Sequence, residues 1–102
     1  MAVATQVDER FRTLADQWKR ESQYLSNTAQ MAMLRSYQCI IGMGEAAVPL
    51  LLNELKQSLD QWFWALESIT AENPVRPGSA GMVERMAADW IEWGVAKGYV
   101  VR

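Results

Sequence analysis

The chain has 102 residues, half of them hydrophobic, and carries a net charge of −2. This length predicts a single domain over residues 1–102, with enough apolar residues to build a core without disulfides. With no histidine and one cysteine, the chain lacks the usual ligands of zinc, haem and iron–sulfur clusters, so we expect no metal and no cofactor. Slight acidity also argues against a nucleic acid partner, which needs a clustered basic surface.

The start of the chain, MAVATQVDERF, has no basic leader followed by an apolar core, which argues against a signal peptide. No apolar run approaches the ~20 residues that a membrane span needs, so we expect no membrane partner. A lone cysteine suits a reducing compartment. We therefore expect a cytoplasmic protein.

The first predicted helix covers residues 6–25. Apolar side chains recur along it at steps of three and four, from Val7 through Phe11 to Trp18. Its basic residues are interleaved with acidic ones, and the pairs Asp8–Arg12 and Asp16–Arg20 have the (i, i+4) spacing. We interpret the outer face as a solvated surface with salt bridges and not as a nucleic acid-binding helix.

Two further helices follow. Residues 26–28 predict a turn and a cap for a helix over 29–41, and the glycines of Gly42-Met43-Gly44 end it. The next helix covers 45–57, with a proline in its first turn. Leu50 lies off its apolar stripe, so this helix is apolar on more than one side.

The last two helices are predicted over 59–71 and 81–97. Ser58 and Gln61 resemble a capping box for the first of them. Gly94 falls on the apolar face of the second, where it favours close packing against another helix or a large side chain. No segment alternates apolar and polar residues over five or more positions, so we expect an all-α fold of about five helices.

The order of these helices predicts two HEAT-like hairpins preceded by an N-terminal helix. In the first hairpin, residues 41–55 contain an apolar helix end, a Gly-x-Gly break, Ala-Val-Pro and a leucine-rich helix. This combination is similar to the turn of a HEAT-type repeat.

A broader pattern extends over nearly the whole chain: Ile-Ile-Gly-Met-Gly at 40–44, Ala-Val-Pro at 47–49, Trp-Phe-Trp-Ala-Leu at 62–66 and Asn-Pro-Val at 73–75. It resembles a family of short, uncharacterised bacterial and cyanobacterial proteins whose genes often lie on mobile or laterally moved DNA, sometimes beside another small gene. The resemblance implies an antitoxin-like protein, a gene-cassette product or an accessory partner of a neighbouring gene product.

This chain departs from that family pattern at two places. It has Arg35-Ser36 where the pattern has His-Pro, and Gln61 where the pattern has a second histidine. A family function that required these histidines would be missing here.

Catalytic chemistry finds little support in the sequence. Cys39 lies opposite the apolar stripe of its helix, near Arg35, and such a cation would favour the reactive thiolate. Because no histidine is available as a base, we interpret Cys39 as a packing or surface residue. Glu84, Asp89 and Glu92 suit a solvated helix face better than a glycosidase pair. We expect no catalytic residue and no enzyme activity.

The tryptophans are the strongest candidates for a functional role in this sequence. Trp18, Trp62 and Trp90 lie on inner stripes, which predicts that they belong to the core. Trp64 points away from the inner face of its helix. Either this helix is sandwiched between layers or Trp64 is exposed, and the sequence leaves both arrangements open.

The first hypothesis is a small protein-interaction module that binds another protein or itself, with a homodimer as one form. Its candidate contact residues are Trp64, Trp93 and Leu50, because exposed tryptophans are frequent at binding hot spots.

The alternative hypothesis is a small-ligand-binding helical protein. Its aromatic pocket would lie between the hairpins, lined by Tyr37, Trp62, Met86 and Trp90. Glu45 or Glu67 would supply charge for a cationic or polar ligand.

Overall fold

A computed structural model describes residues 2–99, with side chains described for residues 6–99. Over this range the chain is all-helical and contains no strand, which confirms the predicted fold class. The elements are α1 Ala2–Ser22, α2 Thr28–Met33, α3 Arg35–Gly42, the 3-10 helix η1 Gly44–Ala47, α4 Val48–Gln57, α5 Phe63–Thr70, the 3-10 helix η2 Pro77–Ser79 and α6 Val83–Ala96.

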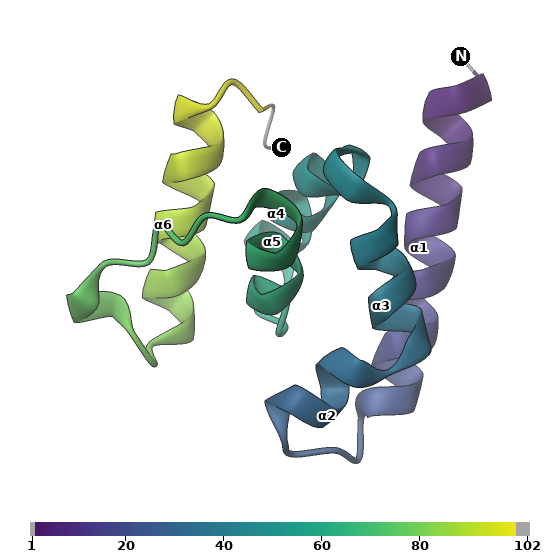
Figure 1. Ribbon diagram of the computed structural model, residues 1–102, viewed down its shortest axis with the longest axis horizontal. Coiled ribbons are helices and arrows are strands. Elements are labelled where there is room, and N and C mark those ends of the chain that lie inside the picture. Colours follow the sequence, from purple (N-terminus) through teal and green to yellow (C-terminus); the bar gives the residue numbers. More distant parts are fainter. Residues whose placement is uncertain (1, 100–102) are drawn as a thin grey trace.

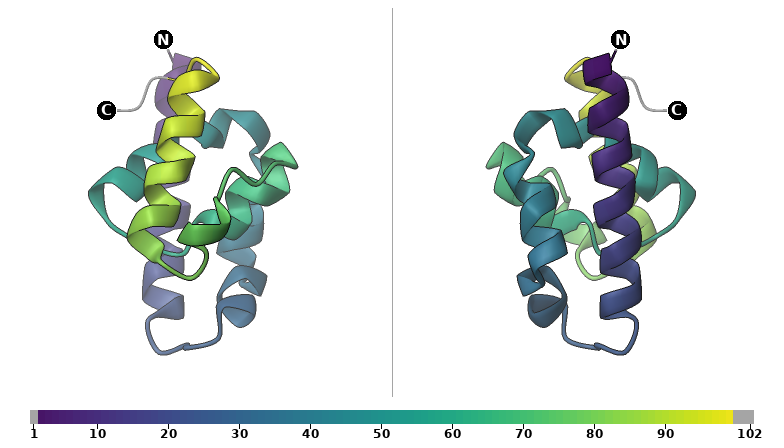
Figure 2. Two further views of the ribbon diagram at one scale, coloured as in Figure 1. Left: turned by 90° about the vertical axis from the view of Figure 1, so that its left-hand side faces the viewer. Right: turned by 90° about the vertical axis from the view of Figure 1, so that its right-hand side faces the viewer.

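The most extensive helix contacts join alternate helices, not consecutive ones. Helix α3 packs against α1 and α5, and α4 packs against α6. Figure 1 shows α1 and α6 on opposite sides of the molecule, with α3, α4 and α5 between them, and Figure 2 shows the same arrangement from each of these two sides. The predicted hairpins would instead pair α3 with α4 and α5 with α6. The chain therefore forms its core by packing helices that are not consecutive in the sequence.

An aromatic cluster from three parts of the chain forms the centre of the core. Trp62 stacks nearly parallel on Tyr37 of α3, with ring centroids 5.5 Å apart and 7° between the planes. The Trp18 ring of α1 lies 4.5 Å from Trp62, and that of Phe11 lies 6.1 Å from it. These rings are buried, as is Trp90 of α6, so the predicted core tryptophans are confirmed.

The helix predicted over residues 29–41 is broken. Leu34 has an extended backbone (φ −61°, ψ 143°) that ends α2 and starts α3. Two carbonyls freed at this break accept hydrogen bonds from side chains: the Trp18 indole N–H donates to Met31 O at 2.9 Å, and the Gln38 amide donates to Ala32 O at 2.7 Å. One side-chain donor from α1 and one from α3 thus bond backbone carbonyls beside the break.

Helix α5 begins later than the predicted start at residue 59, and its first residues have no local side-chain cap. The Tyr37 hydroxyl of α3 accepts a hydrogen bond from the Ala65 N–H at 2.9 Å and donates one to the Gln61 carbonyl at 2.8 Å. Tyr37 thus satisfies an N–H of the first turn, as a capping residue would. The capping box predicted from Ser58 and Gln61 is wrong, because the cap comes from a different helix.

Helices α4 and α6 approach closely at Gly94. A Cβ atom at this position would lie 2.5 Å from the Cδ1 atom of Leu52, a buried side chain of α4. The predicted close packing of another element at Gly94 is confirmed.

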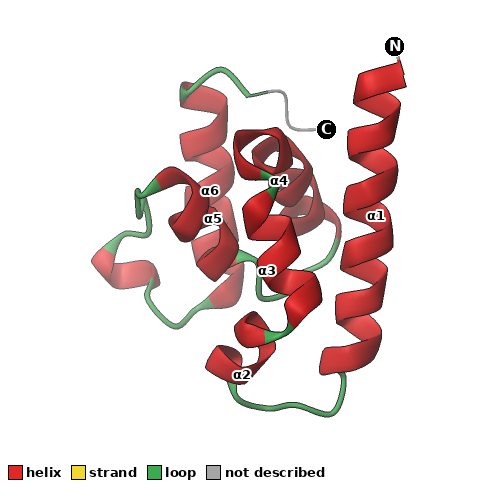
Figure 3. Cartoon of the chain, turned by 45° about the vertical axis from the view of Figure 1, so that its right-hand side comes forward, coloured by secondary structure: helices red, strands yellow, loops and turns green. Residues whose placement is uncertain are grey.

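The connection between α5 and α6, drawn as loop with the short helix η2 in Figure 3, is held by Asp89. Its carboxylate accepts the Arg76 N–H at 3.0 Å and pairs with the Arg76 guanidinium, which also reaches Glu92. The backbone N–H of Arg76 and the Ser79 hydroxyl lower the pKa of Asp89. The predicted solvated face is therefore wrong for Asp89, which is buried, while Glu84 and Glu92 are exposed.

Candidate interaction surface

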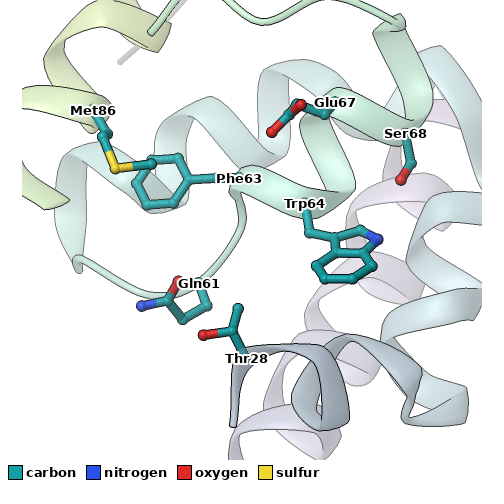
Figure 4. Close-up of a pocket in the computed structure, with 7 residues that line it drawn as sticks. All are labelled: Thr28, Gln61, Phe63, Trp64, Glu67, Ser68 and Met86. Carbon is teal, nitrogen blue, oxygen red and sulfur yellow. The ribbon is translucent and has the colours of Figure 1, made fainter. Parts of the chain in front are cut away.

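A hollow of about 480 Å³ opens where α2, the start of α5 and α6 come together (Figure 4). We name it the Trp64 hollow. It is lined by Thr28 of α2, Gln61 of the preceding loop, four residues of α5 (Phe63, Trp64, Glu67 and Ser68) and Met86 of α6. Figure 4 shows Phe63 and Met86 close together on one side and Trp64 on the other.

The start of α5 determines which of its side chains reach this hollow. Phe63, Ala65 and Leu66 are buried, and of these three Phe63 also lines the hollow. Trp64, Glu67 and Ser68 have the (i, i+3) and (i, i+4) spacing that puts them on one side, and all three are exposed. Trp64 keeps 39% of its surface in solvent. Of the two arrangements left open by the sequence, the structure shows the exposed one.

The lining of the hollow is mixed. Phe63, Trp64 and Met86 are apolar, and three of the others are neutral polar residues. Glu67 is the charged member of the seven. Within the described part of the chain, no cation forms an ion pair with its carboxylate. The hollow therefore combines an aromatic and thioether surface with an unpaired negative charge.

An adjoining hollow extends this surface along α6. It measures about 450 Å³ and is lined by Leu59, Met82, Val83, Glu84 and Arg85. Met82 and Met86 are one helical turn apart, because the Met86 N–H donates to the Met82 carbonyl at 2.9 Å. Since Leu59 and Met82 are exposed apolar side chains, the apolar surface continues beyond the Trp64 hollow.

The other two predicted contact residues lie elsewhere. The Trp93 indole N–H donates to a Glu72 oxygen at 3.1 Å, and the ring packs against Trp90 at 5.2 Å and Tyr99 at 5.8 Å. Leu50 is half-buried and lines a separate groove of about 650 Å³ with residues of α1 and α4. Neither residue lines the Trp64 hollow, so the structure does not bring the three candidates together.

Three of the four predicted pocket residues are core residues. Tyr37, Trp62 and Trp90 are at most 1% exposed, so their surfaces are inaccessible to a ligand in this conformation. Met86 is the exception, since it is half-buried and lines the Trp64 hollow. Glu45 lies near the Tyr99 hydroxyl at 3.5 Å, outside that hollow.

The sequence missed Thr28 and Gln61 as lining residues. Thr28 begins α2 and Gln61 precedes α5, so their meeting depends on how these segments pack. Ser68 could have been found from its spacing to Trp64, because residues four apart share a helix face.

Other kinds of site find no support in the described residues. They contain no group of three or more Cys, Asp or Glu placed to hold a metal ion. None of the described helices combines the length and apolarity needed to cross a membrane. Cys39 is half-buried, in keeping with its interpretation as a packing or surface residue.

Comparison with known proteins gave no match: no family model, no curated protein and no solved structure matches the chain. The family resemblance of the sequence therefore stays a prediction.

Proposed function

We propose that this chain is a small cytoplasmic protein-interaction module without catalytic activity of its own, and that the Trp64 hollow is the centre of its contact surface. The observation that carries the proposal is the exposure of Trp64, since Trp18, Trp62 and Trp90 are completely buried. When a partner covers a large aromatic ring, its apolar surface leaves water, which favours binding. Tryptophan is also enriched at binding hot spots.

The shape of the surface favours a macromolecular partner. Small-molecule sites usually enclose most of the ligand's surface. Here Trp64, Glu67 and Ser68 are exposed, and the apolar surface continues to Leu59 and Met82. A partner's side chains can cover both hollows at once, with an apolar centre and a polar rim as in other protein interfaces.

Glu67 favours a different protein over a second copy. In a twofold symmetric dimer the second copy presents the same patch, and the seven residues that line the hollow include no cation to pair with Glu67. Covering a carboxylate without a partner of opposite charge opposes association. The sequence resemblance described above points in the same direction, to the product of a neighbouring gene.

The test is affinity capture from a lysate of the natural host, including the product of any adjacent gene, read by mass spectrometry. The wild type is compared with Trp64→Ala and with Tyr24→Ala, a control that removes an aromatic ring 90% exposed and lining neither hollow. We expect a stoichiometric partner with the wild type and Tyr24→Ala, and its loss with Trp64→Ala.

Equal retention of the partner by Trp64→Ala would contradict the proposal. Light scattering on the purified proteins covers self-association. A wild-type dimer that becomes a monomer in Trp64→Ala would place a second copy on the surface.

A small ligand is the second candidate, favoured by the volume of about 480 Å³, which lies in the range of small-molecule sites. Trp64 fluorescence, isolated as the difference between wild type and Trp64→Phe, reports on ligands in the hollow. A saturable response to one metabolite with no captured partner would favour this function. No response across a panel of small cations and metabolites would exclude it.

A further inference from the structure

The geometry points to the chemistry of the partner: a segment that places an arginine or lysine side chain against Trp64 and Glu67, with an apolar side chain next to it. This inference rests on the proposed function, because it specifies what the Trp64 hollow binds.

Trp64 and Glu67 together form the two halves of a cation-binding arrangement. They are three residues apart on α5, a spacing at which helix side chains are neighbours. An indole face attracts a guanidinium or ammonium group, and a carboxylate adds a charge-assisted hydrogen bond. Both groups line the same hollow and both are exposed. We therefore expect a cation in the hollow to reach both.

Within the described residues no basic side chain forms an ion pair with Glu67, and four of them pair with other carboxylates. Arg12 and Lys19 pair with Glu54, Arg76 pairs with Asp89, and Lys97 pairs with Glu72. No basic residue is among the seven that line the hollow. Because its carboxylate forms no ion pair within the described residues, Glu67 can accept a cation from a partner, while an acidic partner would be repelled by it.

The adjoining hollow specifies the second feature of the partner. Leu59, Met82 and Val83 form an apolar surface there, with one charge of each sign from Glu84 and Arg85. Its Met82 precedes Met86 by one turn of α6. A segment seated in the Trp64 hollow would bring its neighbouring side chain onto this surface. Methionine side chains adapt to different apolar shapes.

The first experiment is selection of a random peptide library on the full chain, with counter-selection on Trp64→Ala. We expect the peptides that depend on Trp64 to be enriched in arginine or lysine beside a leucine, isoleucine, valine or aromatic residue. Peptides that depend on Trp64 but show no such enrichment would overturn the inference and leave the proposed function standing. A failure to obtain any Trp64-dependent peptide would count against both.

The second experiment is a double-mutant cycle with one selected peptide, measured by calorimetry. The peptide and its analogue, with the basic residue replaced by citrulline or norleucine, are titrated into wild type and Glu67→Gln. For a partly exposed cation site we expect the replacement to weaken binding to the wild type by roughly threefold to tenfold. In Glu67→Gln the same replacement should cost distinctly less.

Glu9→Gln is the matched control, because it removes the same charge from an exposed glutamate on α1, outside the hollow. It should bind both peptides as the wild type does. Equal losses in wild type and Glu67→Gln would show that the carboxylate does not face the peptide's cation, and would overturn the inference. Raising the salt concentration should weaken binding of the basic peptide more than that of its analogue.

Discussion

Trp62 and Trp64 are separated by a single residue, yet Trp62 is completely buried and Trp64 is 39% exposed. Trp62 lies at the boundary where the loop ends and α5 starts, and its ring packs against rings from α1 and α3. Trp64 lies on the first turn of α5 and faces the open hollow beside α2 and α6. The comparison shows that the position of the helix start places one tryptophan in the core, where it stabilises the fold, and the other on the surface, where a partner can reach it.

The largest effect is expected from Trp62. Trp62→Ala removes the ring at the centre of the aromatic cluster and leaves a cavity, so it should lower the free energy of unfolding by about 3–5 kcal/mol. Urea denaturation followed by circular dichroism measures the change. If this variant does not fold, Trp62→Phe, with a smaller cavity, should give a smaller loss. Unchanged stability in Trp62→Phe and Trp62→Ala would refute the central role of the ring.

A smaller loss is expected for Tyr37→Phe, which keeps the ring and removes the hydroxyl. The Ala65 N–H and the Gln61 carbonyl would lose their partner in a buried setting, at a cost of about 1–3 kcal/mol. Tyr24→Phe, which removes an exposed hydroxyl, is the control and should be neutral. Hydrogen exchange at the start of α5 should also accelerate in Tyr37→Phe, and unchanged exchange there would argue against the capping role.

Glu54 is a buried glutamate of α4 that pairs with two cations of α1, and its replacement measures how much this charge contributes to stability. Burial opposes its ionisation, but hydrogen bonds from Arg12 and Lys19 outweigh burial and hold the pKa of Glu54 below its ordinary value of 4.5. Because the folded-state pKa is depressed, this contribution is complete above pH 4.5 and is lost as the pH falls through the folded-state value.

We therefore expect Glu54→Gln to lower the free energy of unfolding at pH 7 by about 1–2 kcal/mol, since it loses two charge-assisted bonds. The difference from wild type should shrink as the pH is lowered to 3. Thermal unfolding of both proteins across this range measures it, with Glu9→Gln as the control for removing one negative charge. A difference independent of pH would mean that the Glu54 carboxylate is not the group responsible.

The smallest effect on stability is expected from Trp64→Ala. Its ring is partly exposed and lines an open hollow, so its removal should change the free energy of unfolding by less than about 1 kcal/mol. Binding, by contrast, should be lost. A loss of stability comparable to that of Trp62→Ala, in the same urea experiment, would remove the distinction between the two tryptophans.

Local sequence patterns predicted the helices well where the helix cap or end was also local. Asn27 caps α2 as expected, with its side chain accepting the Gln30 N–H at 3.1 Å. The predictions failed where long-range contacts decided a boundary. At the break beside Leu34, the bond from Trp18 reaches Met31 from another helix, and the start of α5 depends on Tyr37 of α3. No single predicted helix contains both partners of either bond.

The sequence by itself determined the all-α class, the apolar helix faces and the burial of Trp18, Trp62 and Trp90, because helical periodicity records which side of a helix is apolar. Tertiary structure alone decided that α3 packs against α1 and α5, and that α4 packs against α6. It also decided that Trp64 stays exposed beside Thr28 and Met86. The physical reason is that helical periodicity identifies the apolar face of a helix but not the element that packs against it. An apolar side chain that no other element covers stays exposed and is available to a partner.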